Sequence, residues 1–411
     1  MKSHKTAAKM LKLVGEFSIS GRHINRLTEE IGTELKEKRD RETEDYVHHR
    51  REEPSQPAPQ LVTIAVDGGR TMTREPRQGP GVHGEKWKEY KGACLKEWEA
   101  HTFAEDPHPK PQRCFLDAPK VDKMVREIQS HHGSREENEL PQLAELGLGK
   151  QAPTGTALPK SEEPEAAANS EKDWPPKCAE DARTCVATMQ DSSEFGKMVA
   201  AESYRRNFHA APRGALLGDG SAWIWKLWEK WFPNLTPIVD FVHLLTYLYV
   251  TATVLASSVA ERWEWYVKWM TLCWQGKVRE VIEELEVRQN GLEPFTGTGK
   301  LSPTDPREVV RRTLTYLKNN EPRMNYPEYR KQGLPVTSSM VESLIKEINY
   351  RVKGTEKFWD NPEGAEAILQ VRGAVLSDDN RLPDYIASRP GSSHNRYTKR
   401  DRKKREYTQT A

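Results

Sequence analysis

The sequence predicts an α/β protein in which helices flank a mixed β-sheet. Three features indicate this class. Short β-branched or alternating runs recur along residues 61–240, amphipathic segments of helical period separate the later runs, and a long helical stretch follows. No apolar run is long enough to span a membrane, because the longest, at 237–260, is interrupted by Asp240, His243 and several hydroxyl side chains. We therefore expect no membrane partner.

Five strands and two intervening helices are predicted in this order. The strands are LVTIAV (61–66), WKEYKGACLKEW (87–98), TCVATM (184–189), one in GALLGDG that ends at Asp219, and one in TPIVDFVH that ends near Asp240, and the helices are 192–207 and 221–232. This order is that of the ribonuclease-H-like fold: three strands, a helix, a strand, a helix and a strand, followed by further helices. In that fold the fourth strand lies beside the first, and the fifth lies one position further out.

The domain organisation predicted from composition has six parts. They are a helix-turn-helix at 1–38, a charged linker at 39–60, the core at 61–240, a helical insertion at 241–335, C-terminal core helices at 336–381 and a basic tail at 382–411. Within the core, residues 133–177 are rich in Glu, Pro, Ala and Ser and predict a disordered insertion. The five cysteines form no CxxC pair and the N-terminus lacks a signal-peptide pattern, so we expect a cytoplasmic protein.

Basic residues gather near both ends of the chain. Ser20 is placed to cap a helix that exposes Arg22 and Arg26, which suggests the recognition helix of a helix-turn-helix, although an ordinary helical hairpin has the same pattern. The tail RYTKRDRKKRE is placed to neutralise DNA phosphates or to stand as a solvated terminus. Its candidate contacts are Arg402, Lys403 and Lys404.

Two aspartates follow predicted strands and precede glycines. Asp67 ends the first strand and Asp219 the fourth, so neighbouring strands would bring their carboxylates together at one sheet edge. Two adjacent carboxylates repel, and hard oxygen ligands suit Mg²⁺ or Mn²⁺. Two such ions can support phosphodiester transfer. The alternative for each aspartate alone is a turn or helix cap.

A third carboxylate, Glu342, lies in the predicted helix TSSMVESLIKEINYRVKG. Lys346, Asn349 and Lys353 continue its stripe, opposite an apolar face, so the stripe would meet a metal and then a phosphate backbone. The alternative is a capping box, because Ser339 precedes Glu342 by three positions.

Taken together, several strings resemble the ISKra group of bacterial insertion-sequence transposases. They are IAVDGGR, RTCVATMQDSSEFGKMVAAESYRRN, LLGDGSAWIW, PIVDFVH, GLPVTSSMVESLIKEINYRVKGTEKFW and GAEAILQVR. The resemblance implies a ribonuclease-H-like core and a DDE triad of metal ligands at Asp67, Asp219 and Glu342. It also implies cleavage at terminal inverted repeats of double-stranded DNA, joining of 3′ ends to a target with two Mg²⁺ or Mn²⁺ ions, and a homo-oligomer on DNA.

Two alternatives to an active transposase remain open. Family members often carry a longer N-terminal region with cysteine pairs, whereas this chain starts almost at the predicted helix-turn-helix. A truncated, catalytically incompetent transposase that binds DNA as a repressor is therefore the second hypothesis. The third is a ribonuclease-H-like host nuclease, against which the predicted helix-turn-helix and helical insertion argue.

A further pair of residues resembles a motif of related transposase superfamilies, Asp240-x-x-His243. Asp240 competes with Asp219 for the second ligand position, but the fifth strand should place it further from the metals. We expect Asp240 to cap the helix that starts at Phe241 or to fix the ring of His243.

Overall fold

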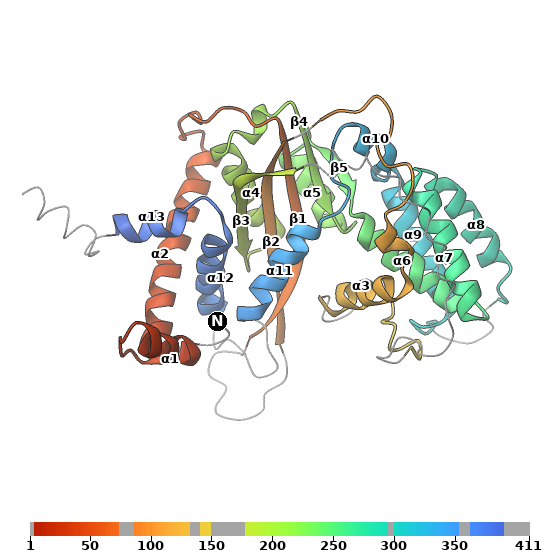
Figure 1. Ribbon diagram of the computed structural model, residues 1–411, viewed down its shortest axis with the longest axis horizontal. Coiled ribbons are helices and arrows are strands. Elements are labelled where there is room, and N and C mark those ends of the chain that lie inside the picture. The colour runs from red at the N-terminus through yellow and green to blue at the C-terminus, as the bar shows by residue number, and fades with distance from the viewer. Residues whose placement is uncertain are drawn as a thin grey trace, which may run out of the picture.

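A five-stranded mixed sheet forms the centre of the computed structural model, which describes residues 4–73, 86–99, 101–131, 140–148, 177–294, 300–352 and 362–389. The strands are β1 (Leu61–Thr73), β2 (Lys86–Glu99), β3 (Lys177–Thr188), β4 (Arg213–Gly218) and β5 (Thr236–Val239). Their order is β3-β2-β1-β4-β5 (Figure 1), with β2 antiparallel to β1 and β3, and β4 parallel to β1 and β5. The five predicted strands are confirmed, as is the place of the fourth beside the first.

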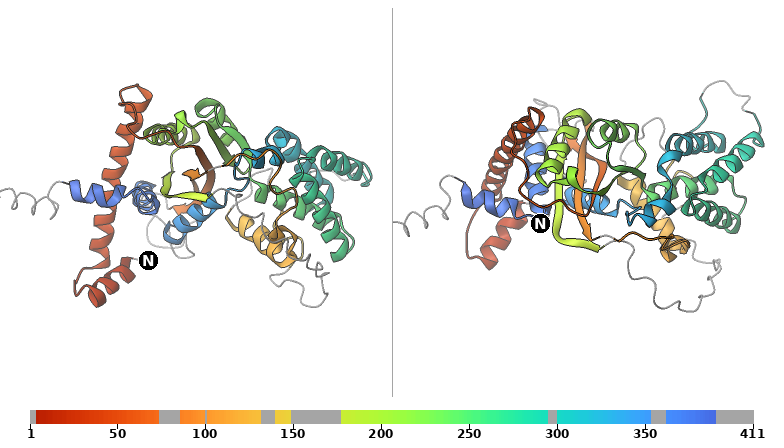
Figure 2. Two further views of the ribbon diagram at one scale, coloured as in Figure 1. Left: turned by 45° about the horizontal axis from the view of Figure 1, so that its top comes forward. Right: turned by 90° about the horizontal axis from the view of Figure 1, so that it is seen from above.

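Helices cover both faces of the sheet, as the two views of Figure 2 show. α4 (Ser192–Arg205) and α5 (Ala222–Trp231) lie on one face, and α11 (Ser339–Val352) crosses the other. α12 (Pro362–Leu376) runs beside the edge strand β3, where the Gln370 amide donates to the Ala187 carbonyl at 2.8 Å. The class, a mixed sheet flanked by helices, is therefore confirmed.

The N-terminal helices differ in length from the prediction. α1 (His4–Val14) and α2 (Gly21–Val47) are separated at the predicted break, and the Ser20 side chain accepts from the His23 amide. α2 continues well past the predicted boundary at residue 38, so the first part of the expected linker is helical. Tertiary contact explains the extension, because α2 packs along α12 and Arg39 forms a 2.7 Å ion pair with Glu366.

A lobe of helices follows β5, in agreement with the predicted helical insertion (Figure 1). Its helices are α6 (Phe241–Leu255), α7 (Val259–Trp274), α8 (Val278–Asn290), α9 (Pro306–Asn320) and α10 (Tyr326–Lys331). An earlier helix, α3 (Ala118–His131), packs against α6 and is not among the predicted elements. No helix within the described ranges is long and apolar enough to cross a membrane.

Part of the segment predicted as a disordered insertion is packed. Residues 140–148 form a turn in which Leu143 is fully buried and its amide donates to the Gln129 side chain at 3.1 Å. The prediction of disorder is wrong there, because Leu143 is buried and the partly buried leucines Leu140, Leu146 and Leu148 pack against the core beside it. Residues 132–139 and 149–176 lie outside the described residues.

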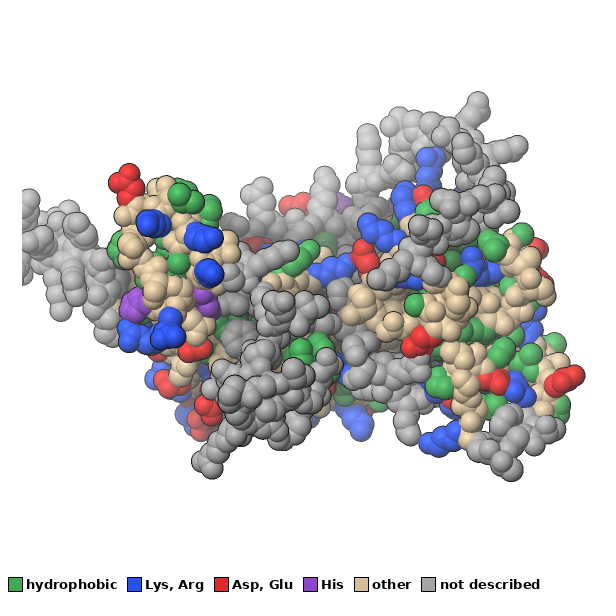
Figure 3. Space-filling model, turned by 90° about the horizontal axis from the view of Figure 1, so that it is seen from below, with side chains coloured by type: hydrophobic (Ala, Val, Ile, Leu, Met, Phe, Trp, Pro, Cys, Tyr) green, Lys and Arg blue, Asp and Glu red, His purple; other side chains and the backbone are tan. Residues whose placement is uncertain are grey.

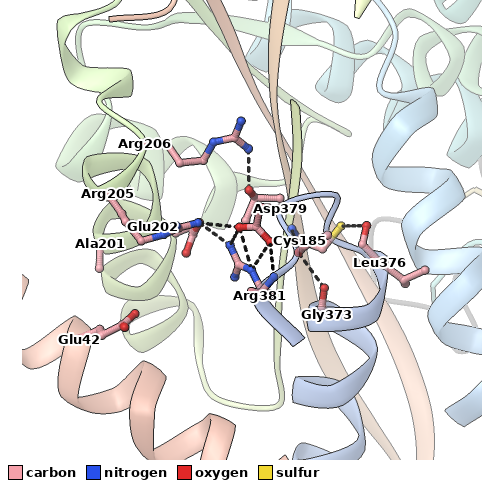
Figure 4. Close-up of polar contacts among 12 residues, drawn as sticks. Glu42, Cys185, Ala201, Glu202, Arg205, Arg206, Gly373, Leu376, Asp379 and Arg381 are labelled. Atoms are coloured by element: carbon pink, nitrogen blue, oxygen red, sulfur yellow. Dashed lines mark hydrogen bonds and ion pairs between the residues drawn. The ribbon is translucent and has the colours of Figure 1, made fainter. Parts of the chain in front are cut away.

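A partly buried ion cluster joins α4 to the chain after α12 (Figure 4). Glu202 accepts from Arg205 at 2.6 Å and from Arg381 at 2.8 Å, and Asp379 accepts from the same two arginines. Arg381 is the first residue of the helix α13 (Arg381–Ser388), and we call these four residues the α4–α13 ion cluster.

The start of the predicted basic tail is ordered and helical. α13 (Arg381–Ser388) occupies it, and Arg389 forms an ion pair with Glu34 of α2 at 2.7 Å. The candidate DNA contacts Arg402, Lys403 and Lys404 lie outside the described residues.

Candidate functional site

Three aspartates lie at equivalent positions on or just after the neighbouring parallel strands β1, β4 and β5. β1 pairs with β4 up to Ala65 opposite Leu217, and β4 pairs with β5 up to Gly218 opposite Val239. Continuing these registers places Asp219 beside Asp67 on one side and beside Asp240 on the other. Neighbouring strands are about 4.8 Å apart, so Asp67 and Asp219 occupy adjacent positions at the carboxyl ends of parallel strands.

The side chains of Asp67 and Asp219 face the same side of the sheet. Asp67 is paired across the antiparallel ladder with Gly92, and a Cβ on Gly92 would lie 2.9 Å from the Ile345 side chain of α11. Directly opposed residues share a face, so Asp67 faces α11. A Cβ on Gly218 would instead meet Ile224 of α5, so the next residue, Asp219, also faces α11.

The start of α11 lies between Asp240 and the strand that pairs with Asp67. Ser338, just before the helix, donates its hydroxyl to Asp240 at 2.7 Å, while Ile345 lies against Gly92 beside β1. From Ser338 the helix runs on to pack against β1 and β2. Glu342 lies in the first turn of α11, between Ser338 and Ile345. Its side chain lies outside the described residues.

Two hydrogen bonds fix the rest of α11 on the sheet. The Tyr90 hydroxyl donates to the Asn349 side chain at 2.9 Å, and the Thr71 hydroxyl donates to the Val352 carbonyl at 3.1 Å. Burial and the charge of Asp67 raise the pKa of Tyr90 well above its ordinary value, so it remains a donor. These hydrogen bonds anchor the C-terminal half of α11 to β1 and β2.

The stripe predicted to continue from Glu342 toward DNA is only partly exposed. Asn349 is engaged by Tyr90, and Lys346 forms a 2.8 Å ion pair with Glu127 of α3 while keeping 37% of its side chain exposed. Lys353 lies outside the described residues. Lys346 thus keeps a surface for phosphate, whereas Asn349 serves the anchoring of the helix.

Asp240 is held entirely by protein donors. Its carboxylate accepts from the Val242 amide, the Ser338 amide and the Ser338 hydroxyl, and it is fully buried. The expected capping of the helix that starts at Phe241 is confirmed. The His243 Nε2 atom lies 3.9 Å from Asp240, beyond hydrogen-bond distance. Asp240 therefore ties β5 and α6 to the start of α11.

Asp67 and Asp219 offer oxygen ligands of the kind that Mg²⁺ and Mn²⁺ prefer. Asp67 accepts from the Gly68 amide at 2.7 Å and Asp219 from the Ser221 amide at 2.8 Å. Among the side chains that the structure describes, no group of three or more His, Cys, Asp or Glu residues could hold a metal ion. With Glu342 outside that set, the described donors are two adjacent carboxylates, which fit a divalent cation.

Sequence reasoning missed two residues that shape this edge. Ser338 connects α11 to Asp240, and the hydroxyl of Tyr316 in α9 donates to the Asp219 carbonyl at 2.9 Å. α11 begins at Ser339, and the side chains of Ser339 and Glu342, on which the capping-box alternative depends, lie outside the described residues. The pair Ser338–Ser339 is a local sequence signal for the start of a helix. No local signal indicates that Tyr316 contacts Asp219.

A basic surface lies away from this edge, on the N-terminal helices. Arg22 and Arg26 are exposed at the start of α2, and Figure 3 shows lysine and arginine side chains gathered over this end of the molecule. The exposed lysines of α1 are Lys5, Lys9 and Lys12.

The chain matches no known protein-family model and no curated protein. Its function is therefore inferred from three features: the neighbouring aspartates Asp67 and Asp219, the helix α11 on the face that they share, and the exposed basic residues of α1 and the start of α2.

Proposed function

We propose that this chain is a DDE-type DNA transposase with a ribonuclease-H-like core. The observation that carries the proposal is the pair Asp67 and Asp219, which stand level on adjacent parallel strands and face α11. Glu342 lies in the first turn of α11, between the Ser338–Asp240 contact and the contact of Ile345 with β2, which supports its proposed role as the third ligand. The strand order, with β4 beside β1, supports the ribonuclease-H-like assignment.

The carboxylates of Asp67, Asp219 and Glu342 would hold Mg²⁺ or Mn²⁺ in this proposal. When bound, the metal activates the attacking water or 3′-hydroxyl and stabilises the leaving oxygen of the phosphodiester. The chain itself supplies the alignment. The paired strands β1 and β4 lead to the two aspartates at neighbouring positions, and the Asp240–Ser338 contact sets the start of α11.

DNA would be held by surfaces outside the carboxylate pair. Arg22 and Arg26 at the start of α2 are placed to face a groove, and Lys346 and the tail residues would contact phosphates. A transposase must bring two element ends together, so we propose that it acts as a homo-oligomer on double-stranded DNA.

The test is a nicking assay on a supercoiled plasmid that carries the coding region with its flanking DNA, in Mg²⁺ or Mn²⁺. Asp67→Asn and Asp219→Asn should each lower nicking by at least about 10³-fold while DNA affinity stays unchanged, because a metal ligand contributes several kcal/mol to the transition state. Asp384→Asn, at an exposed aspartate of α13, is the matched control and should nick normally.

Two outcomes would overturn the proposal. Normal nicking by Asp67→Asn or Asp219→Asn would remove the carboxylate pair from the chemistry. DNA binding by the unaltered chain, without nicking in either metal, would favour the repressor.

A further inference from the structure

Two tyrosines of the helical insertion reach the strand ends at the candidate site. The Tyr316 hydroxyl in α9 donates to the Asp219 carbonyl at 2.9 Å, just beyond β4. The Tyr326 hydroxyl in α10 donates to the Val239 carbonyl at 3.1 Å, one residue before Asp240. The insertion therefore holds the backbone at the ends of both β4 and β5.

Tyr316 is itself held rigidly. Its ring stacks on Tyr247 of α6 with centroids 3.7 Å apart and planes 8° apart, and only 9% of the residue is exposed. Burial raises the pKa of Tyr316 well above its ordinary value, so the phenol keeps its proton and donates. Asn320, one turn further along α9, accepts from the Trp225 indole at 2.9 Å.

The residue after Asp219 fits closely against this ring. Gly220 has a φ of +103°, and a Cβ built on it would lie 2.5 Å from the Tyr316 ring. Only glycine combines that backbone conformation with this approach. The peptide between Asp219 and Gly220 is thus fixed in two ways. The Tyr316 hydroxyl donates to the Asp219 carbonyl, and the Tyr316 ring packs against Gly220.

Asp219 needs this support because it stands beyond the sheet ladder. The last residue of β4 paired with β1 is Leu217, and the last paired with β5 is Gly218. Strand hydrogen bonds therefore do not fix the backbone of Asp219, and the direction of its carboxylate depends on what holds the Asp219–Gly220 peptide.

We propose that Tyr316 is a positioning residue for Asp219, and that the helical insertion is by this contact a structural part of the metal site. The inference rests on the proposed function, because it gives the Asp219 carboxylate a metal to bind. Tyr316 does not touch the reacting atoms; its hydroxyl sets the peptide plane that carries Asp219.

The test compares Mn²⁺ binding by five full-length proteins, measured by electron paramagnetic resonance titration without DNA. They are the unaltered chain, Asp219→Asn, Tyr316→Phe, Gly220→Ala and Tyr266→Phe. Tyr266 is the matched control, because it too is a fully buried tyrosine of the insertion and donates to a backbone carbonyl, that of Phe115, at 3.3 Å. Each phenylalanine variant keeps its ring and loses one hydroxyl.

Tyr316→Phe should raise the dissociation constant for Mn²⁺ about five- to tenfold, the order expected for one hydrogen bond. Tyr266→Phe should stay within about twofold of the unaltered chain even if both variants lose the same stability. Gly220→Ala should weaken Mn²⁺ binding at least as much as Tyr316→Phe, because the added methyl displaces the same peptide.

The outcomes separate this inference from the proposed function. If Asp219→Asn loses Mn²⁺ and Tyr316→Phe binds it as Tyr266→Phe does, the positioning role is wrong and the metal site stands. If Asp219→Asn binds Mn²⁺ normally, the metal site is wrong and the positioning role falls with it.

Discussion

At the α4–α13 ion cluster each carboxylate accepts from arginine, whereas at the sheet edge Asp67 and Asp219 lie beside each other and accept from backbone amides. Glu202 and Asp379 share Arg205 and Arg381, so buried charge is matched within the protein. At the sheet edge like charges are neighbours, which lowers stability until a cation binds. The ion cluster stabilises the fold, whereas the neighbouring aspartates are suited to binding a cation.

The largest stability effect should come from breaking the ion cluster. Arg381→Ala leaves Glu202 and Asp379 sharing one cation, and should lower the free energy of unfolding by about 2–4 kcal/mol, with some screening because a quarter of the arginine side chain is exposed. Urea unfolding measures it. Asp384→Ala, at an exposed residue of α13, should change it by less than about 0.5 kcal/mol, and an equal loss in both variants would contradict the role of the cluster.

The cluster also predicts an acid limit to stability. Burial alone would raise the pKa of Glu202, but the charges of Arg381 and Arg205 outweigh it and lower the pKa from 4.5 to about 2. A depressed folded-state pKa gives stability that is present above pH about 4.5 and is lost as the pH falls toward about 2. We expect a loss of about 2–3 kcal/mol across that window, on the order of 1.4 kcal/mol per pKa unit.

Glu202→Gln supplies the control for this pH dependence. The variant should be less stable at pH 7 and show a shallower fall between pH 4.5 and pH 2. An identical slope in both proteins would mean that other carboxylates set the acid limit.

Asp240 lies beside the pair but is satisfied by protein donors, so its replacement should act through α11. Asp240→Asn removes the acceptor of the Ser338 hydroxyl and should lower nicking about 10- to 100-fold while leaving Mn²⁺ affinity within a few-fold. Ser338→Ala should give a similar loss. Additive losses in the double variant would show that the two residues act separately, contrary to our expectation.

The smallest effect should be a gain in stability at the sheet edge. Without metal, Asp219→Asn removes a like charge next to Asp67 and should raise the free energy of unfolding by about 1 kcal/mol, or the melting temperature by roughly 1–2 °C, since Asp219 is half-buried and partly screened. Differential scanning calorimetry in a chelator measures it. A clear destabilisation would mean that Asp219 has a structural role instead.

The strands and most helices were predictable because their signals are local. The buried run Leu61–Val66 and the short run before Asp219 read directly as strands. The helix α3 carried the same kind of signal, since Val121, Val125 and Ile128 recur at helical spacing. The full length of α2 had no such signal, because its polar sequence is held in helix by packing against α12.

The candidate site was predictable only in part. Aspartates after strands and before glycine marked Asp67 and Asp219, and the strand order brings them level. The contact of Tyr316 with Asp219 spans 97 positions, and the contact of Ser338 with Asp240 spans 98. Such pairs arise from the placement of whole helices, which no local pattern specifies.

The central claim is that Asp67, Asp219 and the start of α11 together form one site for divalent cations. Iron-directed cleavage tests it most directly. Fe²⁺ takes the place of Mg²⁺, and with ascorbate and peroxide it generates hydroxyl radicals that cut the chain close to the metal. We predict cuts near Asp67, Asp219 and Glu342, suppressed by excess Mg²⁺ and absent in Asp219→Asn. Cleavage confined to other segments, or unchanged in Asp219→Asn, would contradict the account.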